Sequence, residues 1–322
     1  MLIGAEILLR VTGIAEPWSV LAKNEPAMFE PDPVLGWKAK PGKFQIDPYS
    51  SEGHETHYTI LGDGSRATSK NQQSNSYDLV FLGGSFTQGF GVSDEDTFAW
   101  KLQSRFPSLQ IGNFGVGGYG TYQSLLLLKN LYRQNMKPAI VIYGFMPFHE
   151  ERNIANSRWR RVLSEFSRRG HSFLPYCSLG ENGNLIEHKP IGYPLLPFRE
   201  HLALADFAAK FYFRFIDAEE VKRRKDGFAI TEKLIDEMNS LAQKNGSSFF
   251  VAILGDPGQY ETFFKNSAIG TIDCRLALTD EYTVQGEGHP NERAHSAWAD
   301  RIATYLIVQP GFRGIFPTKA QE

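Results

Sequence analysis

The sequence has 322 residues, 42% of them hydrophobic, which suits one large globular domain with insertions or two modest domains. Its 34 basic residues nearly balance 36 acidic ones, so the net charge of −2 gives no basis for binding nucleic acid or an anionic membrane through overall charge. Cys177 and Cys274 lie far apart without metal-ligand spacing, so neither a zinc site nor a disulfide framework is indicated.

The first 11 residues are apolar but include Glu6 and Arg10. They are too few to cross a bilayer, which needs about 20 apolar residues. The pattern favours a short amphipathic helix packed on the rest of the protein. The alternative is the edge of a membrane-proximal anchor, which leaves peripheral membrane contact through this segment open.

Proline- and glycine-rich sequence without helical periodicity follows. We expect residues 1–76 to form the N-terminal helix and an irregular arm with short strands, such as residues 57–60. Polar residues 69–76 predict an exposed loop at the end of this arm. The main domain is predicted over residues 77–310, followed by a C-terminal tail at 311–322.

The main domain alternates short apolar runs with helical patterns. This rhythm predicts a mainly parallel sheet with right-handed crossovers and helices on both faces. Strands are predicted at residues 78–82, 109–113, 139–143, 249–254 and near 272. Helices are predicted at residues 97–106, 121–133, 230–244, around 259–265 and 291–306. Residues 93–96 are expected to cap the first of these helices.

The alternation of strand and helix patterns is interrupted by an insertion at about residues 150–228. This insertion contains the basic run Arg158, Trp159, Arg160 and Arg161. A basic run is typical of a solvated helix face. The alternative is a lid over a functional site that contacts anionic or sugar-like groups.

We expect the catalytic site where the first strand of the main domain ends, at Gly83, Gly84 and Ser85. Open α/β sheets bind their ligands at the carboxyl edge of their strands. A serine hydroxyl is a weak nucleophile that needs a base, a group that orients the base, and donors for the oxyanion. His289 lies on a glycine-rich loop before the last helix, and Glu287 two residues earlier is positioned to hold its tautomer.

Three motifs together resemble the SGNH, or GDSL-type, hydrolase superfamily. Residues 83–92, which follow the first strand, are similar to its Gly-Asp-Ser motif and glycine-rich continuation. The glycine-rich residues 113–120 are similar to its second motif, and residues 287–291 to its acid-and-histidine motif. The resemblance spans about residues 78–306. It implies a three-layer α/β/α sandwich with a mainly parallel central sheet, the flavodoxin-like SGNH fold, in which Ser85 is the nucleophile and His289 the base. The backbone N–H groups of Ser85 and Gly118 would form the oxyanion hole.

The sequence departs from that pattern at three places. Gly84 replaces the aspartate before the serine, and glycine at position 286 leaves Glu287 as the acid, with Asp280 a distant alternative. The asparagine that the family supplies after the third strand is absent. His149 is the expected substitute as oxyanion donor, and Asn153 is the alternative.

The resemblance implies a serine ester hydrolase that acts through an acyl-enzyme on carboxylesters or O-acetyl and acyl esters of a small molecule, carbohydrate or lipid. No metal or organic cofactor and no nucleic acid partner is expected. Two alternatives are acyl transfer to a polysaccharide and a binding protein that keeps the fold with impaired catalysis. The glycine-rich turn at residues 115–120 is weak support for nucleotide or phosphopantetheine binding, because no acidic residue follows at about 20 positions. The compartment, bacterial cytoplasm or cell envelope, stays open.

Overall fold

The computed structural model describes residues 2–17, 28–72, 76–166, 173–192, 196–216 and 218–309. The predicted tail at 311–322 lies outside the described residues. So do part of the predicted arm and the middle of the polar loop predicted at 69–76.

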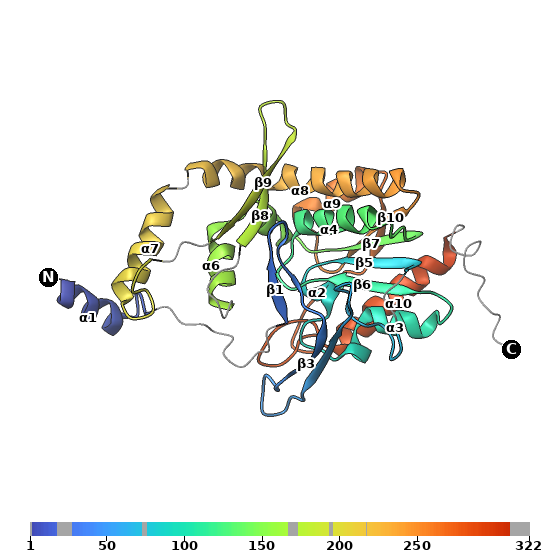
Figure 1. The fold of residues 1–322 in the computed structure, drawn as a ribbon, viewed down its shortest axis with the longest axis horizontal. Coiled ribbons are helices and arrows are strands. Elements are labelled where there is room, and N and C mark those ends of the chain that lie inside the picture. The colour runs from blue at the N-terminus through green and yellow to red at the C-terminus, as the bar shows by residue number, and fades with distance from the viewer. Residues whose placement is uncertain are drawn as a thin grey trace.

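A five-stranded parallel sheet forms the centre of the molecule (Figure 1). Its strands, in the order β11-β10-β7-β5-β6, are β5 (Leu79–Gly83), β6 (Ile111–Gly115), β7 (Ile140–Phe145), β10 (Ser248–Ile253) and β11 (Gly270–Asp273). From β5 the chain moves to β6 on one side and then crosses back to β7 on the other. The strand order therefore reverses beside β5, and the crevice at such a switch point is where open α/β sheets bind their ligands.

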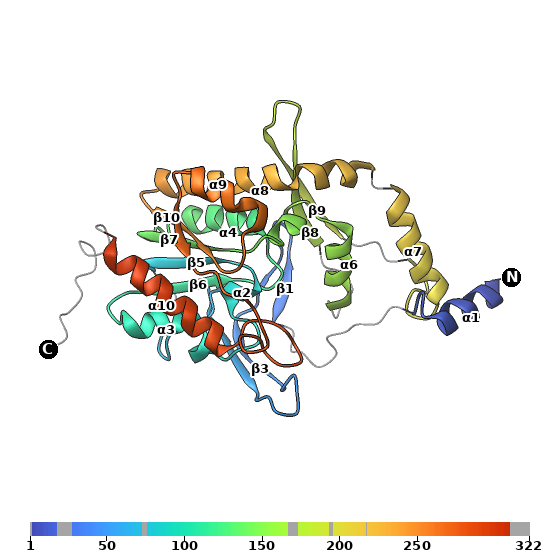
Figure 2. The same ribbon diagram turned by 180° about the vertical axis from the view of Figure 1, so that it is seen from behind.

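Helices cover both faces of this sheet (Figures 1 and 2). One face carries α4 (Thr121–Arg133), α8 (Ala218–Lys244) and α9 (Glu261–Asn266), and the other carries α3 (Phe98–Arg105) and α10 (Glu292–Val308). Strand β5 is buried on both sides: Val80 and Leu82 pack in one apolar cluster, Leu79 and Phe81 in the other. The expected three-layer α/β/α sandwich is thereby confirmed.

The predicted cap at residues 93–96 was wrong. Those residues form a short 3₁₀ helix, η1 (Asp94–Asp96), and the cap of α3 is Thr97, whose Oγ1 accepts the Trp100 N–H at 3.2 Å. Asp94 is turned inward because its carboxylate pairs with Arg66.

The arm supplies Arg66, a fully buried residue that organises the loop after Ser85. Its Nε lies 2.8 Å from Asp94 Oδ1, and its two terminal nitrogens donate to the carbonyl oxygens of four residues: His57, Gln88, Gly89 and Val92. All five N–H groups of the guanidinium are thus used, which explains how a buried charge is tolerated.

Replacing Arg66 by methionine is expected to lower the free energy of unfolding by about 3–5 kcal/mol, because Asp94 would be left as an unpaired buried charge. Chemical denaturation checks this. The matched control is Arg105→Met, which breaks an exposed pair with Asp300 and is expected to cost at most about 1 kcal/mol. Equal midpoint shifts for the two variants would contradict the buried role of Arg66.

Within residues 28–72, the arm contains two antiparallel hairpins, β1 (Phe29–Asp32) with β2 (Gly36–Ala39), and β3 (Gly42–Ile46) with β4 (Thr56–Ile60). The short strand expected at residues 57–60 corresponds to β4. The insertion contains α5 (His149–Asn153), α6 (Ser157–Phe166), the hairpin β8 (Phe173–Leu179) with β9 (Leu185–Gly192), and α7 (Ala203–Ile216). Helix α8 was expected to begin at residue 230 but already begins at Ala218, inside the expected insertion.

The N-terminal helix α1 (Leu2–Thr12) packs on α7, and Figure 1 shows this pair projecting from the body. Glu6 accepts the N–H groups of Ala203 and Leu204, both at 2.9 Å, at the start of α7. The outer face of α1 exposes apolar side chains, including Leu2, Ile3, Ile7, Leu8 and Val11. Within the described ranges no helix is both long and apolar enough to cross a membrane. Peripheral membrane contact through α1 stays a prediction.

Candidate active site

The turn after β5 presents Ser85 as the first residue of α2 (Ser85–Gln88), with Gly84 at the N-cap. Gly83 has a φ of +153°, and a Cβ there would lie 2.2 Å from Thr87 Oγ1. The turn therefore requires glycine at position 83, since a side chain would be strained and would collide with the helix that follows. This close packing holds the Ser85 hydroxyl at the carboxyl edge of the sheet.

Ser85, His289 and Glu287 form a continuous hydrogen-bonded chain. His289 Nε2 lies 2.8 Å from Ser85 Oγ, and His289 Nδ1 lies 2.5 Å from Glu287 Oε1. The second carboxylate oxygen, Oε2, accepts the backbone N–H of His289 at 2.7 Å. The carboxylate thus contacts both the ring and the backbone of the histidine. Asp280, the alternative acid, is exposed.

The loop before α10 explains how a glutamate only two residues before the histidine can reach its ring. Gly286 and Gly288 have φ values of +83° and +91°, the left-handed region that favours glycine. The loop is closed where Val284 donates its N–H to His289 O at 2.7 Å. A Cβ on Gly286 would lie 2.7 Å from Tyr49 O, so this loop packs tightly on the arm.

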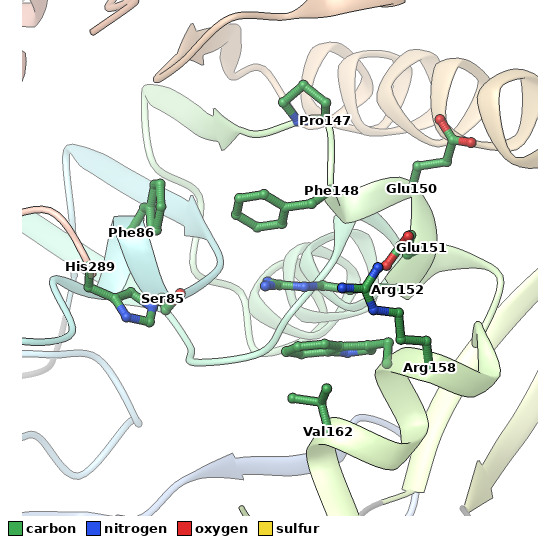
Figure 3. A pocket seen from close by; sticks show the side chains of 11 residues that line it. Ser85, Phe86, Pro147, Phe148, Glu150, Glu151, Arg152, Arg158, Val162 and His289 are labelled. Carbon is green, nitrogen blue, oxygen red and sulfur yellow. Dashed lines mark hydrogen bonds between the residues drawn. The ribbon is translucent and has the colours of Figure 1, made fainter. Parts of the chain in front are cut away.

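Ser85 and His289 open into a cavity of about 700 Å³. Figure 3 shows Ser85, Phe86 and His289 on one side of this cavity and Arg152 and Arg158 on the other. The walls combine apolar and charged side chains, and the remaining lining residues are Pro147, Phe148, Glu150, Glu151, Trp159 and Val162. Arg158 and Trp159 of the basic run border the cavity, whereas Arg160 is buried beside Glu220, so the run is not a wholly solvated helix face. A lid that contacts anionic or sugar-like groups stays a prediction.

Gly118 lies on the loop between β6 and α4, next to the Ser85 turn in the sheet. Its φ is +83°, and a Cβ there would lie 2.9 Å from Trp37 Cζ2. Trp37 holds this loop by donating its indole N–H to Gly117 O at 2.9 Å. The arm thus shapes the backbone at the position where the second oxyanion donor is expected.

The two candidates for the missing donor both lie on α5 and are both buried. His149 Nδ1 lies 2.7 Å from Tyr143 Oη, and neither His149 nor Asn153 lines the cavity. Burial and the charge of Arg152 lower the pKa of His149 well below its ordinary value, so the ring is neutral at pH 7. The residues of α5 that line the cavity are Glu150, Glu151 and Arg152. Arg152 is the cation among them, and the sequence analysis did not single it out.

His295, in the first turn of α10, is structural. It is fully buried, its Nδ1 accepts the Phe98 N–H at 3.2 Å, and burial lowers its pKa to about 3. Among the described residues no group of three or more His, Cys, Asp or Glu is placed to hold a metal ion.

No protein-family model matches the sequence, and a search of curated proteins finds no match. The chain is similar to G-D-S-L lipolytic proteins of known structure. A member of that family from Veillonella parvula is 12% identical, with a TM-score of 0.40, over 72% of this chain and 98% of its own. A G-D-S-L protein from Desulfitobacterium hafniense is 10% identical, with a TM-score of 0.40, over 70% and 97%. A GDSL-like lipase from Bacteroides thetaiotaomicron is 14% identical, with a TM-score of 0.35, over 70% and 86%. Likeness at this level assigns no activity to the chain.

Proposed function

We propose that the protein is a serine ester hydrolase with Ser85 as nucleophile, His289 as general base and Glu287 as the acid that orients it. The observation that carries this proposal is the unbroken chain of hydrogen bonds from Glu287 through His289 to Ser85, at the edge of a cavity large enough for a small ester.

In the proposed reaction Ser85 Oγ attacks the ester carbonyl carbon while His289 Nε2 accepts the hydroxyl proton. The carbonyl electron pair moves onto oxygen, and the oxyanion is stabilised by the N–H groups of Ser85 and Gly118. Ser85 is the first residue of α2, so its N–H has no acceptor within that helix. When the carbonyl re-forms, the ester C–O bond breaks and His289 returns the proton to the leaving alcohol. Water then releases the acyl group by the same steps.

Glu287 fits the role of orienting acid because its Oε1 lies 2.5 Å from Nδ1. A proton held on Nδ1 leaves the lone pair on Nε2, which faces the Ser85 hydroxyl. The carboxylate also stabilises the imidazolium that forms during attack.

Wild-type protein is expected to hydrolyse 4-nitrophenyl acetate and to be labelled at Ser85 by a serine-directed fluorophosphonate. Ser85→Ala is expected to reduce hydrolysis to background and to abolish the label, as followed by absorbance and mass spectrometry. Ser51→Ala, in an exposed turn of the arm, is the matched control and should behave as wild type. Equal background rates for wild type and Ser85→Ala, with no label on either, would reject the proposal.

Acyl transfer is the second candidate, because the cavity combines aromatic with charged side chains, a lining that suits a sugar acceptor. Hydrolysis and transfer share the acyl-enzyme and differ in the acceptor. The protein is incubated with a polysaccharide and an ester whose acyl group carries an isotope label. The ratio of labelled polysaccharide to labelled free acid then separates transfer from hydrolysis.

A further inference from the structure

Asn153 has no hydrogen left with which to bind an oxyanion. Its Nδ2 donates to Thr121 Oγ1 at 3.0 Å and to Thr231 Oγ1 at 2.9 Å, and its Oδ1 accepts the Tyr122 N–H at 3.0 Å. These bonds join α5 to α4 and α8. An amide with both hydrogens engaged in the interior serves the packing of these helices.

His149 presents an acceptor where an oxyanion needs a donor. Tyr143 donates its hydroxyl hydrogen to Thr121 Oγ1 at 2.9 Å, so the 2.7 Å contact between His149 Nδ1 and Tyr143 Oη requires the proton on Nδ1. Burial raises the pKa of Tyr143, which keeps that hydroxyl protonated. Because the His149 ring is neutral, Nε2 carries a lone pair.

Arg152 brings a guanidinium to the same place. Its Nη1 donates to Tyr119 O at 2.8 Å, and its Cζ lies 4.5 Å from the Phe148 ring centroid and 4.4 Å from that of Trp159. Held between two rings, the guanidinium is fixed in place and lines the same cavity as Ser85 (Figure 3). Among the described residues, one of its five N–H groups has a hydrogen-bond acceptor, and that acceptor is Tyr119 O.

Gly84 shows how close this guanidinium comes to the nucleophile. A Cβ added to Gly84 would lie 2.9 Å from Arg152 Nη1, 2.9 Å from Tyr119 O and 3.1 Å from His149 Nε2. The space beside Gly84, where an aspartate side chain would begin, is therefore filled by Arg152 and His149. Gly84 directly precedes Ser85, so Nη1 lies beside the backbone that carries the nucleophile.

We propose that Arg152 is the side-chain donor of the oxyanion hole, in place of the absent asparagine. This inference rests on the proposed esterase function. As the Ser85 Oγ–carbon bond forms, the carbonyl electron pair moves onto oxygen and is met by a guanidinium N–H together with the N–H groups of Ser85 and Gly118. A charged donor stabilises such an anion about twice as strongly as a neutral one. Two of the three departures from the family pattern, glycine at 84 and no asparagine, then share one cause, the guanidinium packed against that turn.

The protonation state of Arg152 agrees with this role. Burial lowers the pKa of Arg152 to about 9, and the charge of Glu151 partly offsets this effect. The group therefore stays positively charged at neutral pH.

The test is Arg152→Ala assayed with 4-nitrophenyl acetate, with and without guanidinium ion. Loss of one oxyanion donor is expected to lower kcat by about 10²–10³-fold with little change in KM. Added guanidinium is expected to restore part of the lost kcat by entering the vacated space, whereas urea, of similar shape but neutral, is not. Arg133→Gln, an exposed residue at the end of α4, controls for loss of a positive charge and should keep wild-type kcat.

A kcat of Arg152→Ala within threefold of wild type, or a loss that appears only in KM, would overturn the proposal while leaving the esterase function intact. Should the alanine variant fail to fold, Arg152→Lys keeps the charge between the two rings and is expected to lower kcat with KM unchanged. Wild-type kcat in that variant would likewise overturn the proposal. A wild-type protein without ester hydrolysis or phosphonate labelling would reject both the function and this inference.

Discussion

Replacing His289 by glutamine is expected to lower kcat for an aryl ester by about 10⁴–10⁶-fold, the largest single effect among residues that keep the nucleophile. His289 Nε2 lies 2.8 Å from Ser85 Oγ and is the group placed to accept its proton. A glutamine keeps a polar side chain but cannot take up a proton at neutral pH. Steady-state kinetics and the rate of fluorophosphonate labelling of Ser85 should fall together, because both need the activated hydroxyl.

The matched control for this experiment is His54→Gln, an exposed histidine of the arm, which should keep wild-type kinetics. The ring of His289 packs against Phe86 and Phe90, with centroids 5.5 Å and 5.0 Å away, so the unfolding midpoint of His289→Gln should also be measured. A folded His289→Gln protein that labels as fast as wild type would show that another group activates Ser85.

Replacing Glu287 by glutamine is expected to lower kcat by about 10⁴-fold with little change in KM. The carboxylate accepts from both Nδ1 and the backbone N–H of His289. A glutamine amide can turn its NH₂ toward Nδ1, which moves the ring proton to Nε2 and leaves no lone pair for the Ser85 hydroxyl. Steady-state kinetics on 4-nitrophenyl acetate measure this loss.

Two nearby residues sharpen the Glu287 experiment. Glu281→Gln changes an exposed carboxylate of the same loop, paired with Arg293, and should keep wild-type kinetics. Asp280→Asn tests the acid that the sequence left as an alternative. A large loss of kcat in Asp280→Asn together with a mild loss in Glu287→Gln would show that Asp280, and not Glu287, orients His289.

Arg66 and Trp37 show that the arm takes part in building the site. Arg66 bonds the carbonyl oxygens of Gln88, Gly89 and Val92, which follow Ser85, and Trp37 bonds Gly117 O before Gly118. Variants of the arm are therefore expected to affect the shape of the site even though none of the arm residues within 2–17, 28–72 and 76 lines the cavity.

The arm's contribution could not be predicted from the sequence. Its residues lie 22 and more positions from the groups that they hold, and no short motif relates them. A lone arginine in a polar stretch is usually exposed, so its burial becomes visible only when the loops around it are folded together.

The sequence by itself determined the α/β class, the approximate position of most strands and helices of the main domain, and the identity of Ser85, His289 and Glu287 as candidates. These features are local: an apolar run of five residues, a glycine turn or a histidine before a capped helix is visible within a short window. The ends of helices were less predictable from the sequence. Helix α8 begins early, at Ala218, because contacts with the insertion stabilise its first turns. One of these contacts is the buried ion pair of Glu220 with Arg160.

Only the tertiary structure decided that Arg152, and neither His149 nor Asn153, lines the cavity. His149, Arg152 and Asn153 lie within five consecutive positions, and their roles differ because of partners far away in sequence. Asn153 is held by α4 and α8, His149 takes its tautomer from Tyr143 and Thr121, and Arg152 is clamped by Trp159 of the insertion. The charge state of a side chain, the tautomer of a histidine and the direction in which each side chain points all depend on such packing. Packing between distant segments cannot be recognised in a short stretch of sequence.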